Sequence, residues 1–267
     1  MATFTLVDDR TIVTQDNMRL GGKMRLHLAG VGGNRKAIQL HSTNPRIAGG
    51  RIIALFNGPK GIWTVEIDAF ATGKAEIHAK HNGKVVAKLQ VTVAKKLTLP
   101  AATTQEGMLV RLFLAESPPP AKSSYNATDA KKGMQWMRLV LENRLKNNPG
   151  QFLAPGAKTI TDIVRARGQV EGFENYPTLK AGLQARINDI VKIANDDSDR
   201  RQEKHETFLL NALEVATGKA VVLDPCPTRL YGWRTADSRS PGGRFKKYGT
   251  PLSGNQFYTL EPEKPSK

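Results

Sequence analysis

The hydrophobic pattern of this 267-residue chain changes its period once, near residue 97. Before that point apolar residues alternate with polar ones, as in KMRLHL and GIWTVEIDA, which is the period of a β-strand with one buried face. After it, apolar residues recur every three or four positions, which indicates amphipathic helices. Because a chain of this length can bury two cores, we expect two domains, residues 1–97 and residues 98–267.

The N-terminal region is typical of an all-β sandwich. Its short strands are broken by Gly and Asn, and KAEIHAKHNGKVVAKLQVTV has the pattern of a hairpin that turns at Asn82-Gly83, the pair that best tolerates positive φ angles. In size and in its closing KLQVTV strand, the region resembles bacterial immunoglobulin-like (Ig-like) modules. We find no catalytic constellation in it, so we expect a docking or spacer domain.

The C-terminal region predicts a mainly α-helical domain, with at least five helices up to about residue 217. A capping box of Thr103 and Glu106 is expected to begin the first helix. The last helix has apolar residues at helical spacing and ends at Gly218, a natural C′ position. Residues 219–267 are rich in Gly, Pro and Arg, and we expect them to form long ordered loops.

The chain is strongly basic, with 40 Lys and Arg against 24 Asp and Glu and a formal charge of +16. Such a charge implies a polyanionic partner, for which nucleic acid, acidic lipid and bacterial cell wall are the alternatives. Zinc-finger spacing, a basic-region zipper and an aromatic RNP signature are all missing, so nucleic acid is the unlikely one. No phosphate-loop motif is present, which argues against an NTPase.

Other classes are excluded by short-range features. No apolar run approaches the roughly 20 residues that a membrane-spanning helix needs. The first residues, MATFTLVDDR, lack the basic and apolar parts of a secretion signal, so we expect synthesis in the cytoplasm and export by a non-classical route. Cys226 is the only cysteine and no Cys/His cluster has zinc spacing, so we expect no disulfide, no metal and no cofactor.

One carboxylate has an unusual position, in MLVRLFLAESPPP at residues 108–120. Glu116 continues the apolar stripe of the first helix, and three prolines end that helix directly after it. Burial would raise the pKa of this carboxyl toward neutrality, which is the property a general acid needs. The structural alternative is a salt bridge to Arg111 or Lys122. The stripe consists of Leu109, Leu112, Phe113 and Glu116 at i, i+3, i+4 and i+7.

Five segments then follow in a recognisable order: FLAES, WMRLVLENRLKN, ITDIVRARGQVEGFE, ALEVATG with DP behind it, and GNQFYTL. Together they resemble the cell-wall hydrolases of the SleB type, a lysozyme-like family of bacterial peptidoglycan lytic enzymes. The resemblance covers residues 105–262. The positions that carry it are Glu116, Asn143-Arg144, Gly168-Gln169, Asp224-Pro225, Gly254-Asn255 and Phe257-Tyr258.

The resemblance implies cleavage of the β-1,4 bond between N-acetylmuramic acid and N-acetylglucosamine, with Glu116 as the acid. A lytic transglycosylase needs no second carboxylate, whereas a muramidase usually does. Glu171 is the candidate for that second carboxylate, with Glu174 and Asp237 behind it. The chain departs from the family pattern twice, because SPPP follows Glu116 where the family has a second acid, and Gln256 replaces a closing histidine.

The resemblance also implies that Gln169, Asn255 and Tyr258 hydrogen-bond the sugar, although a buried Tyr and a turn Asn are the structural alternatives. The segment GWRTADSRSPGGRFKKYG, residues 232–249, gathers cations around aromatic residues. Trp233 and Arg239 in it are candidates for binding an anionic glycan. The same mixture suits single-stranded nucleic acid, and also a solvated loop.

From this class of enzyme we expect an exported antibacterial protein that acts in the periplasm or cell wall. A type VI secretion effector fits best, with the N-terminal domain bound to a secretion-spike protein and an acidic immunity protein as its inhibitor; a phage endolysin is second. Two rivals stay open. One is a peptidoglycan amidase that uses Cys226 with His205, and the other is a non-catalytic basic adaptor that binds wall or nucleic acid.

Overall fold

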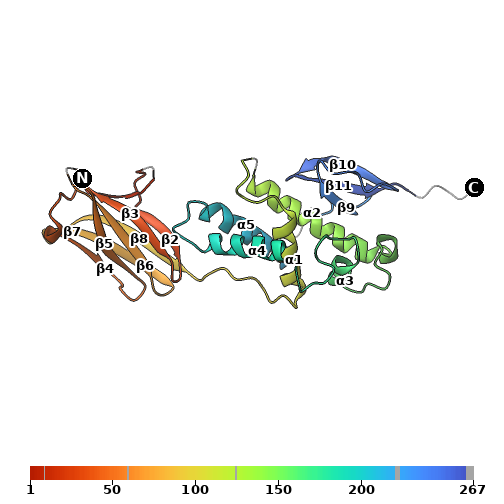
Figure 1. The fold of residues 1–267 in the computed structure, drawn as a ribbon, viewed down its shortest axis with the longest axis horizontal. Coiled ribbons are helices and arrows are strands. Elements are labelled where there is room, and N and C mark those ends of the chain that lie inside the picture. The colour runs from red at the N-terminus through yellow and green to blue at the C-terminus, as the bar shows by residue number, and fades with distance from the viewer. Residues whose placement is uncertain (9, 59, 124, 220–222, 263–267) are drawn as a thin grey trace, which may run out of the picture. The chain divides into compact units, whose positions relative to one another are not determined.

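The computed structural model describes residues 1–8, 10–58, 60–123, 125–219 and 223–262. The chain divides into two compact units (Figure 1). The N-terminal unit consists of residues 1–97 together with residues 195–202, and the C-terminal unit of residues 98–194 and 203–267. The change of hydrophobic period near residue 97 therefore coincides with the division, except that a short segment from the second half clusters with the first.

The N-terminal unit is a β-sandwich, as expected. One sheet has the strand order β1-β3-β6-β5 and the other the order β2-β8-β7-β4. Neighbouring strands are antiparallel except for β2 and β8, which are parallel. The strands are β1 Thr3–Leu6, β2 Gln15–Arg19, β3 Lys23–Ala29, β4 Ile38–Ser42, β5 Ala48–Asn57, β6 Ile62–Ala69, β7 Gly73–His81 and β8 Lys84–Ala94.

The alternating pattern of the sequence produces the core of this sandwich. Side chains of a β-strand point to opposite faces in turn, so every second residue of β3 and β6 can enter the interior. Those residues are almost completely buried, and the polar residues between them point to the other face of the sheet, where His27 and Glu66 are also buried. The buried set from these two strands is Met24, Leu26, Leu28, Trp63, Val65, Ile67 and Ala69.

The predicted hairpin is confirmed, and it joins β7 to β8. Its two turn residues, Asn82 and Gly83, have φ angles of 50° and 78°. Positive φ at both central positions is the requirement of the tight turn whose twist matches that of the flanking strands. A side chain added at Gly83 would meet no atom within 4 Å, so only the backbone conformation requires glycine there.

Replacing Gly83 by alanine should lower the free energy of unfolding of the N-terminal unit by about 1 kcal/mol, because an L-residue is strained at positive φ. The same substitution at Gly182, near the start of helix α4 (Ala181–Ala194), should instead be neutral or stabilising. Urea titration followed by hydrogen-exchange mass spectrometry measures both, because it separates peptides of the two units. Equal effects at the two positions would contradict the turn assignment.

The C-terminal unit contains the five expected α-helices. They are α1 Gln105–Glu116, α2 Ala127–Lys146, α3 Ile160–Arg165, α4 Ala181–Ala194 and α5 Gln202–Ala216, with a 3-10 turn at Pro149–Phe152. The first helix begins one residue later than predicted, because its N-cap is Thr104, whose side chain accepts a hydrogen bond from the Gly107 amide. Gly218 ends α5 with a φ of 74°, as expected for a C′ glycine.

The prediction of long loops after residue 219 was wrong. Residues 232–260 contain an antiparallel sheet of order β10-β11-β9 that packs against α2 (Figure 1). Its strands are β9 Gly232–Thr235, β10 Phe245–Leu252 and β11 Asn255–Leu260. The central strand β11 is buried on both faces from Asn255 to Thr259, so its sequence lacks the alternation by which a half-buried strand is identified.

The described residues include neither a membrane-spanning helix nor a metal-binding cluster. None of the helices in the described part of the chain is long and apolar enough to cross a membrane. Within the same residues, no group of three His, Cys, Asp or Glu side chains could hold a metal ion.

Candidate functional site

Glu116 is the last residue of α1. The helix is buried on nearly all sides, and its apolar residues leave Glu116 half-buried at its C-terminal end. The Ser117 amide donates to the Phe113 carbonyl and closes the last turn, after which Pro118 leads the chain away. The carboxylate therefore lies at the rim of the core, as its place in the apolar stripe predicted.

Trp233 contacts this carboxyl from the sheet. Its indole Nε1–H donates a hydrogen bond to Glu116 Oε2 over 3.1 Å. Trp233 is on β9, more than 100 positions along the chain, and its partner across the ladder is Phe257 of β11. The sheet that sequence patterns missed thus supplies the residue that orients the carboxyl.

Burial raises the pKa of Glu116 above its ordinary value of 4.5. The hydrogen bond from Trp233 and the positive charge of Arg186 on α4 act in the opposite direction, and the negative charge of Glu171 adds to the rise. Burial also lowers the pKa of Arg186, although Glu116 raises it. For both Glu116 and Arg186, the loss of hydration therefore changes the pKa more than the attraction between their charges does.

Two further polar atoms beside Glu116 lack hydrogen-bond partners within the described chain. They are the buried Ser117 Oγ and the buried Nε of Arg186. Arg186 Nη2 does donate to the Ser117 carbonyl over 2.5 Å, which fixes the guanidinium next to the end of α1. Buried polar atoms without partners are uncommon, and a catalytic or binding role is one explanation for them.

Replacing Glu116 by glutamine should stabilise the protein more at pH 8 than at pH 4. Because folding raises the pKa of Glu116, the folded protein holds this proton more tightly than the unfolded chain. The stability that the folded protein gains from holding this proton is fully present below pH 4.5, and it is lost as the pH rises through the pKa of the folded state. Glutamine does not titrate, so the variant loses no such stability. Thermal unfolding of both proteins across this range measures the difference. Glu106→Gln in the first turn of α1 is the control, and a Glu116→Gln difference that does not grow with pH would contradict the assignment.

The C-terminal end of α2 holds the segment that precedes β9. Asn143 Nδ2 donates to the Leu230 carbonyl over 2.9 Å, and Arg144 Nε donates to the Tyr231 carbonyl over 2.7 Å. Both side chains are less than one-tenth exposed. These bonds fix the chain two residues before Trp233, so the Asn-Arg pair of the sequence motif positions the strand that contacts Glu116.

Arg144 also connects Gln169 to this arrangement. Its Nη1 donates to Gln169 Oε1 over 2.5 Å, and its guanidinium lies 5.4 Å from the ring centre of Phe152 and 5.9 Å from that of Trp233. Burial lowers the pKa of Arg144 to about 10. Among the described residues this buried cation has no carboxylate partner, and oxygens of neutral groups and aromatic rings compensate it instead.

Asp224 closes the loop that connects α5 to β9. Its Oδ2 accepts from Asn143 Nδ2 over 2.6 Å and from the Leu230 amide over 3.1 Å, and its Oδ1 accepts from the Cys226 amide over 2.9 Å. The Asp-Pro pair of the motif is therefore structural. It works with Asn143 to hold residues 224–231 against the helix.

The predicted second carboxylate, Glu171, lies in a different environment from Glu116. Its side chain is 91% exposed and forms an ion pair with Lys180 over 3.6 Å. Its charge nevertheless acts on Glu116, so the fold brings the two residues close enough to interact. Of the two reserve candidates, Glu174 is half-buried and Asp237 is exposed in the loop between β9 and β10.

Two predicted sugar-binding residues are buried, which contradicts that role. Tyr258 is 1% exposed and packs edge-on against Phe245 in the core of the sheet. Asn255 is 3% exposed, and its Nδ2 donates to the Ser253 carbonyl inside the β10–β11 turn. Gln256, which stands in place of the family's histidine, is also buried, and its Nε2 donates to three backbone carbonyls.

The other predicted binding residues lie partly or wholly at the surface. Gln169 is half-buried next to Arg144, and Arg239 is exposed in the β9–β10 loop, where its carbonyl accepts from Arg234. Trp233 is half-buried with its nitrogen bound to Glu116. The cation-rich segment around residues 232–249 is thus mainly two strands and a loop, and its basic side chains are exposed.

The surroundings of Cys226 differ from those of an activated thiol. Cys226 is 4% exposed, and its Sγ contacts Thr228 Oγ1 at 3.3 Å. His205, the histidine considered as its base, is a buried residue of α5. A nucleophilic cysteine needs a base within hydrogen-bond reach, and the polar partner of this thiol is the Thr228 hydroxyl.

The sequence motif singled out Glu116, Asn143, Arg144 and Asp224. Their contacts became visible only in the structure. The motif missed Arg186, whose guanidinium adjoins the end of α1. The helix α4 that carries it is a regular amphipathic helix, and Arg186 precedes the buried Ile187 as any surface arginine could. No local signal separates it from the other basic residues of a chain with a charge of +16.

Comparisons with known proteins give no assignment of activity. Neither a protein-family model nor a curated protein matches the sequence. Among solved structures, domains 4 and 5 of the S-layer protein SbsC are 20% identical over 30% of this chain, with a TM-score of 0.25. The tandem Ig repeats of Dlar are 16% identical over 38% of it, with a TM-score of 0.22. The chain spans 47% and 51% of these two structures, and likeness of this degree supports no functional argument.

Proposed function

We propose that the C-terminal unit cleaves peptidoglycan glycan strands between N-acetylmuramic acid and N-acetylglucosamine, with Glu116 as the general acid. The observation that carries the proposal is the environment of this carboxyl. It is half-buried at the end of α1, it accepts a hydrogen bond from Trp233, and burial raises its pKa. A glycosidase needs a carboxylic acid that keeps its proton near neutral pH in order to protonate the leaving oxygen.

The polar atoms around Glu116 support this assignment. Ser117 Oγ and Arg186 Nε are buried beside the carboxyl and without partners in the described chain, so the end of α1 holds polar groups whose hydrogen bonds are unmet. Gln169 accepts a hydrogen bond from Arg144, whose guanidinium lies 5.9 Å from the ring centre of Trp233. The positive charge of Arg186 also stabilises the carboxylate that forms when Glu116 releases its proton.

The role of Glu171 depends on the product. In a hydrolase, a second carboxylate directs water or stabilises the oxocarbenium-like state, and the charge interaction between Glu171 and Glu116 favours Glu171 for it. In a lytic transglycosylase, Glu116 alone suffices: after protonating the glycosidic oxygen it accepts the proton of the muramic C6 hydroxyl, which closes a 1,6-anhydro ring.

We also propose a fold class for each of the two units. We assign the C-terminal unit to the lysozyme-like class, with α1 as the helix that ends at the catalytic acid. We assign the N-terminal sandwich to the Ig-like class. The strand orders support the Ig-like assignment. The orders β1-β3-β6-β5 and β8-β7-β4 match the orders A-B-E-D and G-F-C of the two sheets of an Ig-like sandwich.

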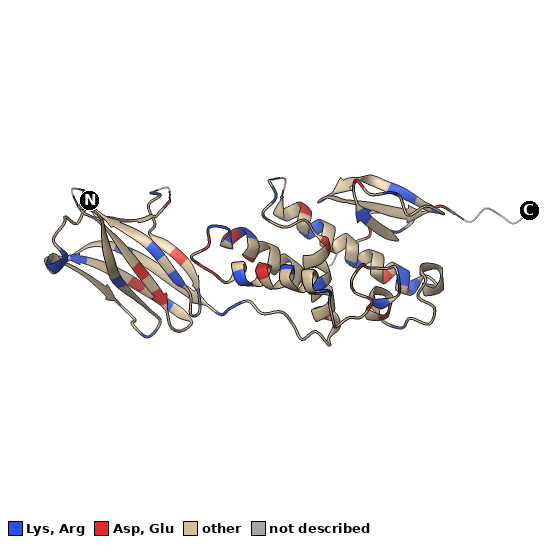
Figure 2. Ribbon diagram, in the orientation of Figure 1, with Lys and Arg blue, Asp and Glu red and all other residues tan. Residues whose placement is uncertain are grey.

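We further propose an exported antibacterial effector that acts in the periplasm or cell wall, with the N-terminal unit docked on a secretion-spike protein. The basic character of the chain supports an anionic wall as substrate and an acidic immunity protein as inhibitor. Lys and Arg side chains are spread over both units (Figure 2).

Mass spectrometry of purified peptidoglycan digested with the protein tests the proposal. Anhydro-muropeptides would establish a transglycosylase, and reducing-end disaccharides would establish a hydrolase and make Glu171 the next residue to replace. Intact glycan with cut peptides would overturn the proposal in favour of an amidase. Binding to the wall without any cleavage would overturn the proposal in favour of a non-catalytic basic adaptor.

A further inference from the structure

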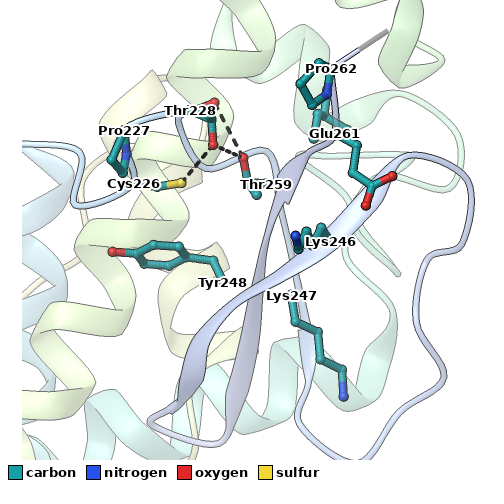
Figure 3. Close-up of a pocket in the computed structure, with 10 residues that line it drawn as sticks. Cys226, Pro227, Thr228, Lys246, Lys247, Tyr248, Thr259, Glu261 and Pro262 are labelled. Carbon is teal, nitrogen blue, oxygen red and sulfur yellow. Dashed lines mark hydrogen bonds between the residues drawn. The ribbon is translucent and has the colours of Figure 1, made fainter. Parts of the chain in front are cut away.

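A second pocket lies on the β9–β11 sheet, apart from Glu116. It has a volume of about 510 Å³ and is bounded by β10, β11 and the loop of Cys226 (Figure 3). Neither Glu116 nor Trp233 or Arg186 contributes to its lining. Ligand pockets in proteins usually measure about 300–1,000 Å³, so this one has the size for a small organic molecule. Its lining residues are Cys226, Pro227, Thr228, Lys246, Lys247, Tyr248, Thr259, Leu260, Glu261 and Pro262.

One wall of the pocket consists of hydroxyl groups. Thr228 Oγ1 and Thr259 Oγ1 are 2.7 Å apart, and Cys226 Sγ lies 3.3 Å from Thr228 Oγ1 (Figure 3). Thr259 is only 9% exposed, so β11 fixes its hydroxyl in place. A hydroxyl both donates and accepts, so this pair can bind a ligand oxygen and still keep its mutual bond.

One ammonium group lies on the same face of the sheet as the hydroxyl pair. Lys246 stands directly opposite Thr259 in the β10–β11 ladder, so the two side chains emerge on the same face of the sheet. Lys247 follows it in β10 and points to the opposite face, away from the hydroxyl pair (Figure 3), and the Glu261 carboxylate also lines the pocket. No described residue forms an ion pair with Lys246, so this ammonium group can bind an external anion.

The remaining walls are apolar. The Tyr248 ring extends toward the Cys226 loop (Figure 3), and its hydroxyl is bound to the Pro225 carbonyl over 2.7 Å, which fixes the ring. Pro227, Leu260 and Pro262 supply rigid or aliphatic surface. A ligand for this pocket therefore combines an anionic group with a body that can pack on an aromatic ring.

We propose that this pocket binds a small organic anion, in which a carboxylate or phosphate group contacts Lys246 and accepts a hydrogen bond from one hydroxyl of the Thr228–Thr259 pair, and the rest of the molecule packs on Tyr248. The site is separate from Glu116 and does not depend on the function proposed for that residue.

Cys226 is a built-in reporter, because it lines the pocket and is the only cysteine of the chain. The rate of its alkylation by iodoacetamide, a neutral reagent, measures access to the pocket. The probes are N-acetylmuramic acid, which carries a carboxylate, and glycerol 3-phosphate. The control is N-acetylglucosamine, which lacks the lactyl carboxylate but is otherwise the same sugar as the first probe.

One or both anionic probes should slow alkylation about tenfold at ten times their Kd, since the pocket is then about 90% occupied, and N-acetylglucosamine should not. Lys246→Gln should weaken this protection, whereas Lys204→Gln on α5, the same loss of charge elsewhere, should not. The probe that protects identifies a carboxylate or a phosphate ligand. Protection must also persist in Glu116→Gln, which keeps this test separate from that of the catalytic site.

Three results would overturn the proposal. The first is the absence of protection together with no heat of binding for either anion in a calorimetric titration. The second is equal protection by N-acetylglucosamine, which would make the charge irrelevant. The third is full protection in Lys246→Gln, which would remove this residue from the site.

Discussion

Glu116→Gln should reduce the rate of glycan cleavage about 10²- to 10⁴-fold, the usual contribution of a general acid. The substitution keeps the shape of the side chain, and its amide oxygen can still accept the hydrogen bond from Trp233. It removes the proton that the leaving oxygen requires. Release of soluble muropeptides from purified peptidoglycan, compared at equal protein concentration, measures the loss.

Glu106→Gln is the matched control, since it makes the same change at the other end of α1. It should leave the rate within about twofold, because Glu106 lies in the first turn of the helix and Glu116 in its last. If Glu116→Gln retained the wild-type rate, Glu116 would not be the acid. If both variants lost activity and also unfolded at lower temperature, the effect would lie in the helix.

Asp224→Ala should lower the free energy of unfolding of the C-terminal unit by about 3 kcal/mol. It removes the acceptor of three donors, Asn143 Nδ2 and the amides of Cys226 and Leu230. Each buried donor left without a partner costs about 1–3 kcal/mol. Because the three donors share one acceptor group, we do not expect their costs to add in full. Because the same loop leads into β9, the release of Trp233 should also reduce cleavage. Denaturant titration and the muropeptide assay measure the two effects.

Asp237→Ala is the matched control, because Asp237 is exposed in the β9–β10 loop of the same unit. Its effect should stay within about 0.5 kcal/mol. Asp224→Asn should lie between the two, since it keeps one acceptor oxygen. Equal losses for Asp224→Ala and Asp237→Ala would mean that the bonds to Asp224 do not hold the loop.

Where the signal is local, sequence predicted the structure well. The period of two in β3 and β6, the Asn82-Gly83 turn and the apolar stripe of α1 each depend on residues close in sequence, so a local pattern is sufficient. Strand β11 is buried on both faces and therefore shows no period. That is why Asn255 and Tyr258, which the motif implied as sugar ligands, are instead part of a core.

The sequence by itself determined the two units, the five helices and the place of Glu116 at the end of an apolar helix face, because hydrophobic period and proline act over a few residues. Only the tertiary structure decided what surrounds that carboxyl. Trp233, Arg186 and Glu171 come from a strand, a helix and a loop that lie 55 or more positions away in sequence. The burial that raises the pKa of Glu116 is likewise a property of the packed unit, since desolvation depends on every neighbouring atom rather than on adjacent residues.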